Sequence, residues 1–241
     1  MKNQTVMVRL NKFISDCGIT SRRKSEEFIL QGRISVNDKI ISELSFKIDP
    51  SKDIVALDGE KLFQKKHIYY LLNKPKGVVT TTDDEKNRKT VVDLIKTKEK
   101  IYPVERLDYN TTGVLLLTND GEFSNLLTHP KNKVPREYEV KLDRELTEED
   151  KLKLIKGIYL NNQKGNFIRV MFSRKNNRKN VNVTAIEGRN HFVKNMFGLL
   201  GYKVIALNRK SFAGISADIP VGSYRTLSPK EILGVINLYG G

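Results

Sequence analysis

A short apolar run at residues 114–117 follows directly on the polar stretch 106–113 and ends before a turn that contains Gly121. An apolar run bounded in this way predicts a strand that is buried on both faces. It places one carboxylate, that of Asp108, at the edge of the buried strand, where neighbours can hold it rigidly and tune its pKa. Arg106, two residues earlier, is a candidate to keep it ionised. The alternative is a loop aspartate that caps a turn or pairs with a surface arginine.

The charge of the chain indicates the class of its partner. The chain has 241 residues, of which 39% are hydrophobic, and it carries a net charge of +15 with a pI of about 9.7. A folded protein this basic is expected to bind a polyanion, usually nucleic acid, with an anionic membrane surface as the alternative. No apolar run approaches the roughly 18 residues of a spanning helix, and no signal segment follows Met1. We therefore expect a cytoplasmic protein with no membrane partner.

The sequence offers few groups that could hold a cofactor. The single cysteine, Cys17, excludes an internal disulfide and a cysteine-based metal cluster. The three histidines, His67, His129 and His191, are scattered without the spacing of metal ligands. No glycine-rich phosphate loop is present. We therefore expect no metal and no cofactor, so that any chemistry must use side chains alone.

Residues 7–60 have the pattern of a small separate unit. Apolar residues at positions 10, 13, 14 and 17 fall on one helical face that ends at Gly18, and Thr20 or Ser21 can cap a second helix that ends at Gly32. A hairpin is expected around Asn37-Asp38. A unit of this size buries little surface, which favours a binding module. Residues 61–67 are expected to form a linker to a larger domain at 68–241.

Three consecutive cations, Arg22, Arg23 and Lys24, stand at the start of the second predicted helix. Cations there oppose the helix dipole, so phosphate binding explains them better than stability does; the alternative is an exposed charged turn. The segments 9–14, 18–26 and 32–37 together resemble an S4 RNA-binding domain. That resemblance implies that Arg9, Lys12 and the three cations grip structured RNA.

The larger domain is predicted to be α+β. Strands are expected at 68–72, 114–118, 136–142, 167–172, 181–186 and 202–207, and helices near 91–96, 121–129, 147–155, 189–200 and Pro229. The polar stretch 173–180 is expected to be a loop. Many strands in irregular order with interspersed helices indicate a mixed central sheet flanked by helices.

The stretch 106–121 as a whole resembles the catalytic motif of RNA pseudouridine synthases of the RsuA/RluB type. The resemblance implies that Asp108 is the one essential catalytic residue. Residues 70–80 resemble the first motif of the family, in which Lys74 and Lys76 are plausible phosphate contacts. The tripeptide 136–138 resembles the basic-x-Tyr motif, which implies that the ring of Tyr138 packs on the target uracil. By itself, a tyrosine in a strand is usually ordinary packing.

Residues 187–197 resemble the third motif of the family, and this implies that the basic residue at Lys194 lies against the catalytic carboxylate. The family commonly has Arg at this position and Gln at the position of Phe192. Lysine keeps the charge but lacks the bidentate fork. Arg189 is the alternative partner of Asp108, and Lys194 alone would suggest a solvated helix face. His191 is interpreted as a structural histidine.

The resemblance spans residues 7 to about 240 and implies the isomerisation of a flipped-out uridine to pseudouridine in ribosomal RNA, closest to the enzymes that modify 23S rRNA. The expected partner is ribosomal RNA or a pre-ribosomal particle, and the protein is expected to act as a monomer. Attack of Asp108 on the sugar and a glycal-type route both remain open. Alternatives are the same chemistry on 16S rRNA, a non-catalytic ribosome assembly factor, and a glycoside hydrolase, which would need a second placed carboxylate such as Asp120.

Overall fold

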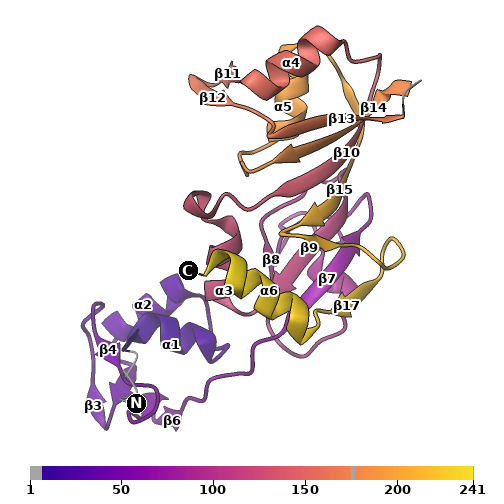
Figure 1. Ribbon diagram of the computed structural model, residues 1–241. Coiled ribbons are helices and arrows are strands. Elements are labelled where there is room, and N and C mark those ends of the chain that lie inside the picture. Colours follow the sequence, from indigo (N-terminus) through magenta and orange to yellow (C-terminus); the bar gives the residue numbers. More distant parts are fainter. Residues whose placement is uncertain (1–6, 175–176, 241) are drawn as a thin grey trace. The chain divides into compact units, whose positions relative to one another are not determined.

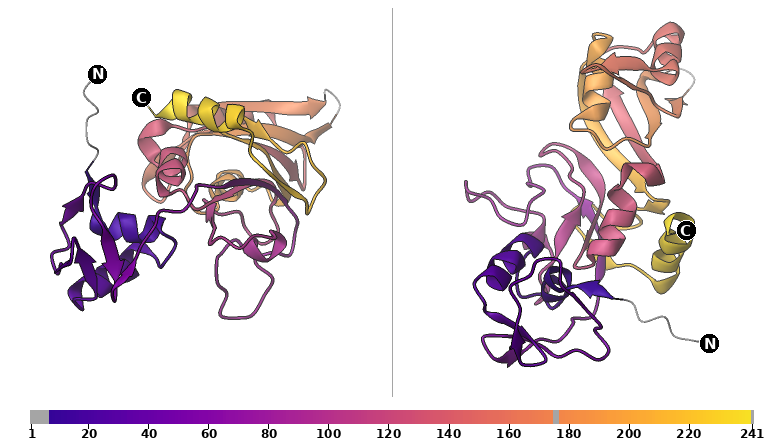
Figure 2. Two further views of the ribbon diagram at one scale, coloured as in Figure 1. Left: turned by 90° about the horizontal axis from the view of Figure 1, so that it is seen from below. Right: turned by 90° about the vertical axis from the view of Figure 1, so that its left-hand side faces the viewer.

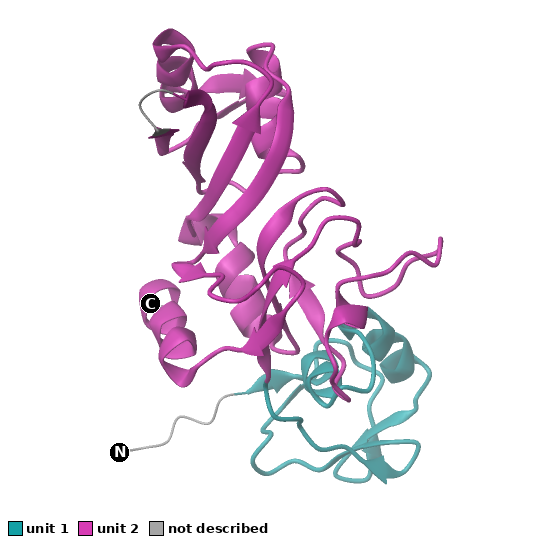
Figure 3. Ribbon diagram, turned by 90° about the vertical axis from the view of Figure 1, so that its right-hand side faces the viewer, with its two compact units in different colours: residues 1–67 teal, residues 68–241 magenta. Residues whose placement is uncertain are grey.

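The structure is a computed structural model that describes residues 7–174 and 177–240. The chain divides into two compact units, one that ends at His67 and one that begins at Ile68 (Figure 3). We refer to them as unit 1 and unit 2. Of the stretch 173–180, which the sequence predicts to be a loop, residues 175 and 176 lie outside the described residues.

Unit 1 combines two helices with small antiparallel sheets. The helices are α1 (Leu10–Asp16) and α2 (Arg22–Leu30). A four-stranded sheet has the order β3-β2-β5-β6, and a separate pair joins β1 to β4. The strands are β1 (Val8–Arg9), β2 (Ile34–Val36), β3 (Lys39–Ile40), β4 (Lys47–Ile48), β5 (Val55–Leu57) and β6 (Glu60–Lys61).

The local sequence of unit 1 accounts for its elements. The apolar face of α1 is buried in one cluster with Ile29 of α2. The hydroxyl oxygen of Ser21 accepts a hydrogen bond from the backbone N–H of Lys24 at 3.3 Å and caps α2. Asn37 and Asp38 both have left-handed φ values, +50° and +65°, which suit the tight turn between β2 and β3. The two helices and the hairpin predicted from the sequence are confirmed.

Unit 2 is built on a mixed nine-stranded sheet with the order β13-β14-β10-β15-β9-β7-β17; β16 pairs with β15, and β8 pairs with β9. The pair β15–β9 is parallel and the other described pairs of this sheet are antiparallel. The strands are β7 (Tyr69–Lys74), β8 (Tyr102–Val104), β9 (Thr112–Thr118), β10 (Arg136–Leu142), β13 (Arg169–Arg174), β14 (Asn177–Ala185), β15 (Val204–Phe212), β16 (Ile215–Ser216) and β17 (Tyr224–Thr226), with a separate hairpin of β11 (Ile158–Leu160) and β12 (Gln163–Gly165). The predicted α+β class is confirmed.

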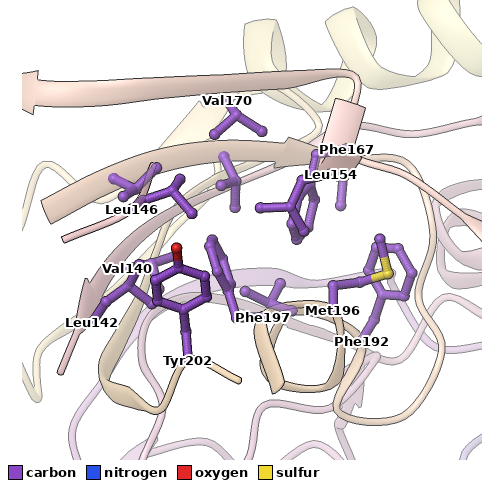
Figure 4. Close-up of a cluster of buried hydrophobic side chains, with 14 of the residues drawn as sticks. Val140, Leu142, Leu146, Leu154, Phe167, Val170, Phe192, Met196, Phe197 and Tyr202 are labelled. Atoms are coloured by element: carbon purple, nitrogen blue, oxygen red, sulfur yellow. The ribbon is translucent and has the colours of Figure 1, made fainter. Parts of the chain in front are cut away.

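Helices cover both ends of this sheet (Figure 1). They are α3 (Gly121–Thr128), α4 (Glu148–Lys156), α5 (Phe192–Leu199) and α6 (Pro229–Tyr239), with 3-10 turns η1 (Val92–Leu94) and η2 (Pro130–Asn132). The buried side chains of α4 and α5 pack on β10, β13 and β14 in one hydrophobic cluster. Figure 4 shows side chains of this cluster. Helices α3 and α6 lie side by side and share a second cluster with β7 and β9 (Figure 2).

One half of the sheet is formed by β13, β14, β10 and β15, and the other by β9, β7 and β17. The two halves meet where β15 runs parallel to β9. Asn208 pairs with Thr112, and Arg209 pairs with Gly113. Gly113 has a φ of +104°, and a Cβ at this position would overlap the carbonyl oxygen of Arg209. Glycine is therefore required here, at the residue where the polar loop that carries Asp108 enters β9.

Some predicted boundaries were wrong. Strand β13 continues to Arg174 and β14 begins at Asn177, which pair with each other, so the predicted loop is shorter. Because β13 is an edge strand, its solvent-facing positions tolerate polar residues. The predicted helix at 91–96 is only the turn η1, and α5 begins at Phe192. Strand β15 runs beyond residue 207 because its buried Ser211 and Arg209 find side-chain partners.

Candidate active site

A cleft of 1310 Å³ in unit 2 brings together residues that are far apart in the sequence. Asp108 comes from the loop between β8 and β9, Tyr138 from β10, and His191 and Lys194 from the start of α5. All four line the cleft, as do Arg106 and Arg189. The parallel pairing of β15 with β9 places the Asp108 loop beside the half of the sheet that carries Tyr138 and α5.

Each oxygen of the Asp108 carboxylate faces a nitrogen of the α5 segment. The Nζ of Lys194 lies 2.5 Å from Oδ2, and the Nε2 of His191 lies 3.2 Å from Oδ1. The Asp108 side chain is 25% exposed, so it remains open to the cleft. The structure thus places Lys194, and not Arg189, beside the carboxylate. An ammonium group at this distance stabilises the carboxylate anion, since the two are partly shielded from water.

Arg189 and Arg106 have other surroundings. The guanidinium of Arg189 lies 2.6 Å from the carboxylate of Glu187 and donates to the carbonyl oxygen of Leu160 at 3.2 Å. Arg106 is exposed. Among the described residues, the ion pairs of Asp108 are those with His191 and Lys194, so Arg106, the candidate to keep this carboxylate ionised, does not pair with it.

Lys74 was predicted to contact phosphate, and this was wrong because its side chain is fully buried. Its Nζ donates to carbonyl oxygens at 3.1–3.3 Å, those of Pro75, Asp108, Tyr109 and Thr111. Burial lowers the pKa of Lys74 to about 8, and the nearby charge of Asp108 opposes that shift. Lys74 therefore holds the backbone of the Asp108 loop. Lys76 is exposed on the following turn, and its contact with phosphate stays a prediction.

Tyr138 and Phe192 line the cleft and also pack in the hydrophobic core. Tyr138 is partly buried and packs against the hydrophobic clusters on both sides of it while its side chain also lines the cleft. Phe192 is 4% exposed and packs edge-on against Phe167, with ring centroids 5.6 Å apart. An apolar side chain at position 192 is thus explained by the core beneath α5.

A buried ion cluster in the wall of the cleft was not predicted from the sequence. The carboxylate of Glu105 accepts from the guanidinium of Arg136 and lies 3.1 Å from Nη1 of Arg209. The arginine side chains are 3% and 1% exposed. Arg209 also donates to the carbonyl oxygen of Val114 at 2.7 Å, and Arg136 donates to that of Ile186 at 3.1 Å. The cluster therefore ties the Asp108 loop to β9, β10, β15 and the segment before α5.

The basic residues of unit 1 that the S4 resemblance implicates in RNA binding fall into two groups. Arg22, Arg23 and Lys24 are exposed, and none of them forms an ion pair within the part of the chain that the structure describes. Arg9 instead lies 3.7 Å from Glu26 and donates to the carbonyl oxygen of Leu44, and Lys12 pairs with Asp16 at 3.0 Å. Of these five residues, the three consecutive cations are thus the ones whose side chains remain available to an anion.

Within residues 7–174 and 177–240, no group of three or more His, Cys, Asp or Glu side chains is arranged to hold a metal ion. None of the described helices has the length and apolar character needed to cross a membrane. Asp120, the second carboxylate that a glycoside hydrolase would need, instead caps α3 by accepting from the N–H groups of Glu122 and Phe123.

Comparison with known protein families matches both units. The family described as RNA pseudouridylate synthase matches residues 68–198, and the S4 domain matches residues 8–54. A crystal structure of a pseudouridylate synthase covers 95% of this chain and 99% of its own, with a TM-score of 0.68 and 31% sequence identity.

Two bacterial relatives are similar along almost their whole length. Ribosomal large subunit pseudouridine synthase B of Bacillus subtilis is 39% identical over 94% of this chain and 94% of its own. Ribosomal small subunit pseudouridine synthase A of Escherichia coli is 34% identical over 95% of this chain and 100% of its own. The similarity therefore extends across both units.

Proposed function

Because the chain belongs to the RsuA/RluB-type RNA pseudouridine synthases, and is therefore an isomerase that converts uridine to pseudouridine, we propose that it acts on ribosomal RNA, in particular 23S rRNA. The large-subunit relative is 39% identical and the small-subunit relative 34% identical, which favours 23S over 16S rRNA. The net charge of +15 suits a polyanionic substrate. The observation that carries the catalytic assignment is the Asp108 carboxylate, held between Lys194 and His191 in an open cleft.

The chemistry of the reaction fits a site made of side chains alone. The bond from N1 of uracil to C1′ of ribose breaks, a bond from C5 to C1′ forms, the hydrogen on C5 leaves as a proton, and N1 takes up a proton. The product is an isomer, so neither an oxidant nor a group donor takes part. An anionic carboxylate serves this reaction by attacking the sugar carbon or by assisting departure of the base, and Asp108 supplies it.

The base must leave its stack to reach the carboxylate, since the target atoms of a paired nucleotide are covered by its neighbours. The cleft of 1310 Å³ has room for a flipped nucleotide together with parts of its neighbours. Tyr138 lines the same cleft as Asp108 and offers an aromatic face for stacking with uracil. Arg22, Arg23 and Lys24 provide exposed cations for RNA phosphates through unit 1.

The proposal is tested with unmodified transcripts of 23S and 16S rRNA. After incubation with the protein, pseudouridine is mapped by chemical labelling and primer extension. We expect new pseudouridine in 23S rRNA and none in 16S rRNA. Modification of 16S rRNA alone would contradict the choice of substrate. Binding of both RNAs without any modification would instead indicate a non-catalytic assembly factor.

Replacing Lys194 by Met should lower the turnover rate about a hundredfold, because the carboxylate of Asp108 loses its cation. Methionine matches the length of the lysine stem, so the packing of α5 is kept. Lys194→Arg restores a cation and should retain most activity. Arg189→Met is the matched control, since Arg189 pairs with Glu187. Single-turnover kinetics would contradict this assignment if Arg189→Met abolished the reaction and Lys194→Met did not.

Replacing Arg22, Arg23 and Lys24 together by Ala should weaken RNA binding and reduce its salt dependence. If all three contact phosphates, the slope of log K against log salt should fall by roughly 0.7–0.9 for each lost contact. The control removes the same charge from exposed lysines on the strands of unit 1, Lys39, Lys47 and Lys61. Equal slopes for the two triple variants would show that the α2 cluster has no special role.

A further inference from the structure

His191 contacts the oxygen of Asp108 that Lys194 leaves free. Its Nε2 lies 3.2 Å from Oδ1, while the Nζ of Lys194 lies 2.5 Å from Oδ2. The two residues come from one turn of chain, because His191 is the N-cap of α5 and Lys194 is the third residue of that helix. The carboxylate therefore has a nitrogen neighbour at each end.

The backbone at His191 is held in an unusual conformation. Its φ and ψ are +53° and 23°, in the left-handed region that residues with a Cβ seldom occupy. The turn is fixed from both sides, since the N–H of Phe192 donates to the carbonyl oxygen of Arg189 and that of Asn195 donates to the carbonyl oxygen of His191. Conformations of this kind persist where the surroundings impose them, and they concentrate at functional sites.

The two donors differ in what they can fix. The lysine ammonium is a point charge on a flexible stem, so it neutralises Oδ2 but leaves the carboxylate plane free to turn about Cβ–Cγ. The imidazole is a planar ring with one donor direction at Nε2, and this atom lies 3.2 Å from the opposite oxygen. A carboxylate held at both oxygens has one orientation, which is what attack at a single carbon atom requires.

We infer that His191 is a positioning residue of the reaction: its Nε2–H donates to Oδ1 of Asp108 and fixes the plane of the carboxylate. The neutral tautomer with hydrogen on Nε2 and the imidazolium both supply this donor. His191 is 51% exposed and lines the cleft, so it serves without being part of the core. This inference rests on the proposed function, in which Asp108 is the reacting carboxylate.

The test compares His191→Gln with His191→Asn. The Gln amide nitrogen reaches as far as Nε2 and can replace the donor, whereas the Asn amide is shorter and stops at the reach of Nδ1. The left-handed backbone favours Asn, so a purely conformational role predicts the opposite order. We expect His191→Gln to keep kcat within threefold of wild type, and His191→Asn to lose at least tenfold in kcat with KM within twofold.

Equal activity of the two variants, or a more active Asn variant, would overturn the inference. A loss of tenfold or more in both would also overturn it, because the imidazole would then act by something other than this hydrogen bond. The melting temperature of each variant checks that it is folded.

A second measurement needs neither turnover nor a folded Gln variant. Long-range 1H–15N spectra of the wild-type protein report which ring nitrogen of each of the three histidines carries hydrogen, and His191→Asn identifies the signal of His191. We expect hydrogen on Nε2 and a changed Nε2 shift in Asp108→Asn. A bare Nε2 would overturn the inference. An inactive wild-type protein that still shows this hydrogen bond would instead refute the proposed function.

Discussion

Asp108→Asn is expected to lower pseudouridine formation by at least about a thousandfold, equivalent to about 4 kcal/mol of transition-state stabilisation. Asparagine has almost the same shape, so the change removes the charge and the nucleophilic oxygen and leaves the loop in place. Lys74 holds that loop through backbone carbonyl oxygens, which the substitution does not alter. RNA affinity should therefore stay within about threefold of wild type.

The matched control is Asp120→Asn, which makes the same chemical change in the same motif. Asp120 caps α3, and asparagine caps helices about as well as aspartate, so its substitution should change both stability and turnover little. Chemical mapping of pseudouridine in a time course compares the two variants. Activity of Asp108→Asn within tenfold of wild type would rule out the role assigned to its carboxylate.

Glu105→Gln is expected to destabilise unit 2 by about 3–5 kcal/mol. The substitution removes the carboxylate that, among the described residues, pairs with the buried guanidinium groups of Arg136 and Arg209, and breaking a buried ion cluster leaves charge uncompensated. Because the cluster also ties the Asp108 loop to β10 and β15, turnover should fall as well. Urea unfolding followed by circular dichroism measures the loss as a shift of the midpoint with the m-value unchanged.

Glu139→Gln provides the comparison for this stability measurement. Glu139 lies on β10 with its side chain exposed, so the same chemical change there should alter the unfolding free energy by less than about 0.5 kcal/mol. A Glu105→Gln variant as stable as Glu139→Gln would show that solvent reaches the cluster and screens it.

The local patterns of this sequence predict much of the fold. The apolar run after Asp108 forms the buried centre of β9, and the helical spacing of Leu10, Phe13 and Ile14 forms α1. Both depend on neighbours within a few residues, which is the range over which periodicity operates. The resemblance to a family motif also predicted a contact between distant residues: Lys194 is 86 residues from Asp108 in the sequence and lies against it in the structure.

The remaining features depend on contacts that no local pattern reports. Glu105 meets its arginine partners 31 and 104 residues away, and a charged residue of this kind is ordinarily expected at the surface. Four backbone carbonyl oxygens compensate the burial of the Lys74 ammonium group. These oxygens come together only when the loop is folded, so no local pattern reports them. One feature of the sequence could have predicted the place of His191 beside Asp108. It lies one helical turn before Lys194, and this spacing puts both residues at the same end of α5.

The most direct measurement of the central claim is the release of tritium from RNA labelled at C5 of uridine. Isomerisation through C5 expels this hydrogen, so its appearance in water counts turnovers without regard to where the RNA binds. A 23S rRNA fragment incubated with the wild-type protein should release tritium in step with pseudouridine formation, and Asp108→Asn should release none above background. Tritium release by Asp108→Asn at the wild-type rate would contradict the assignment of this carboxylate as the centre of the reaction.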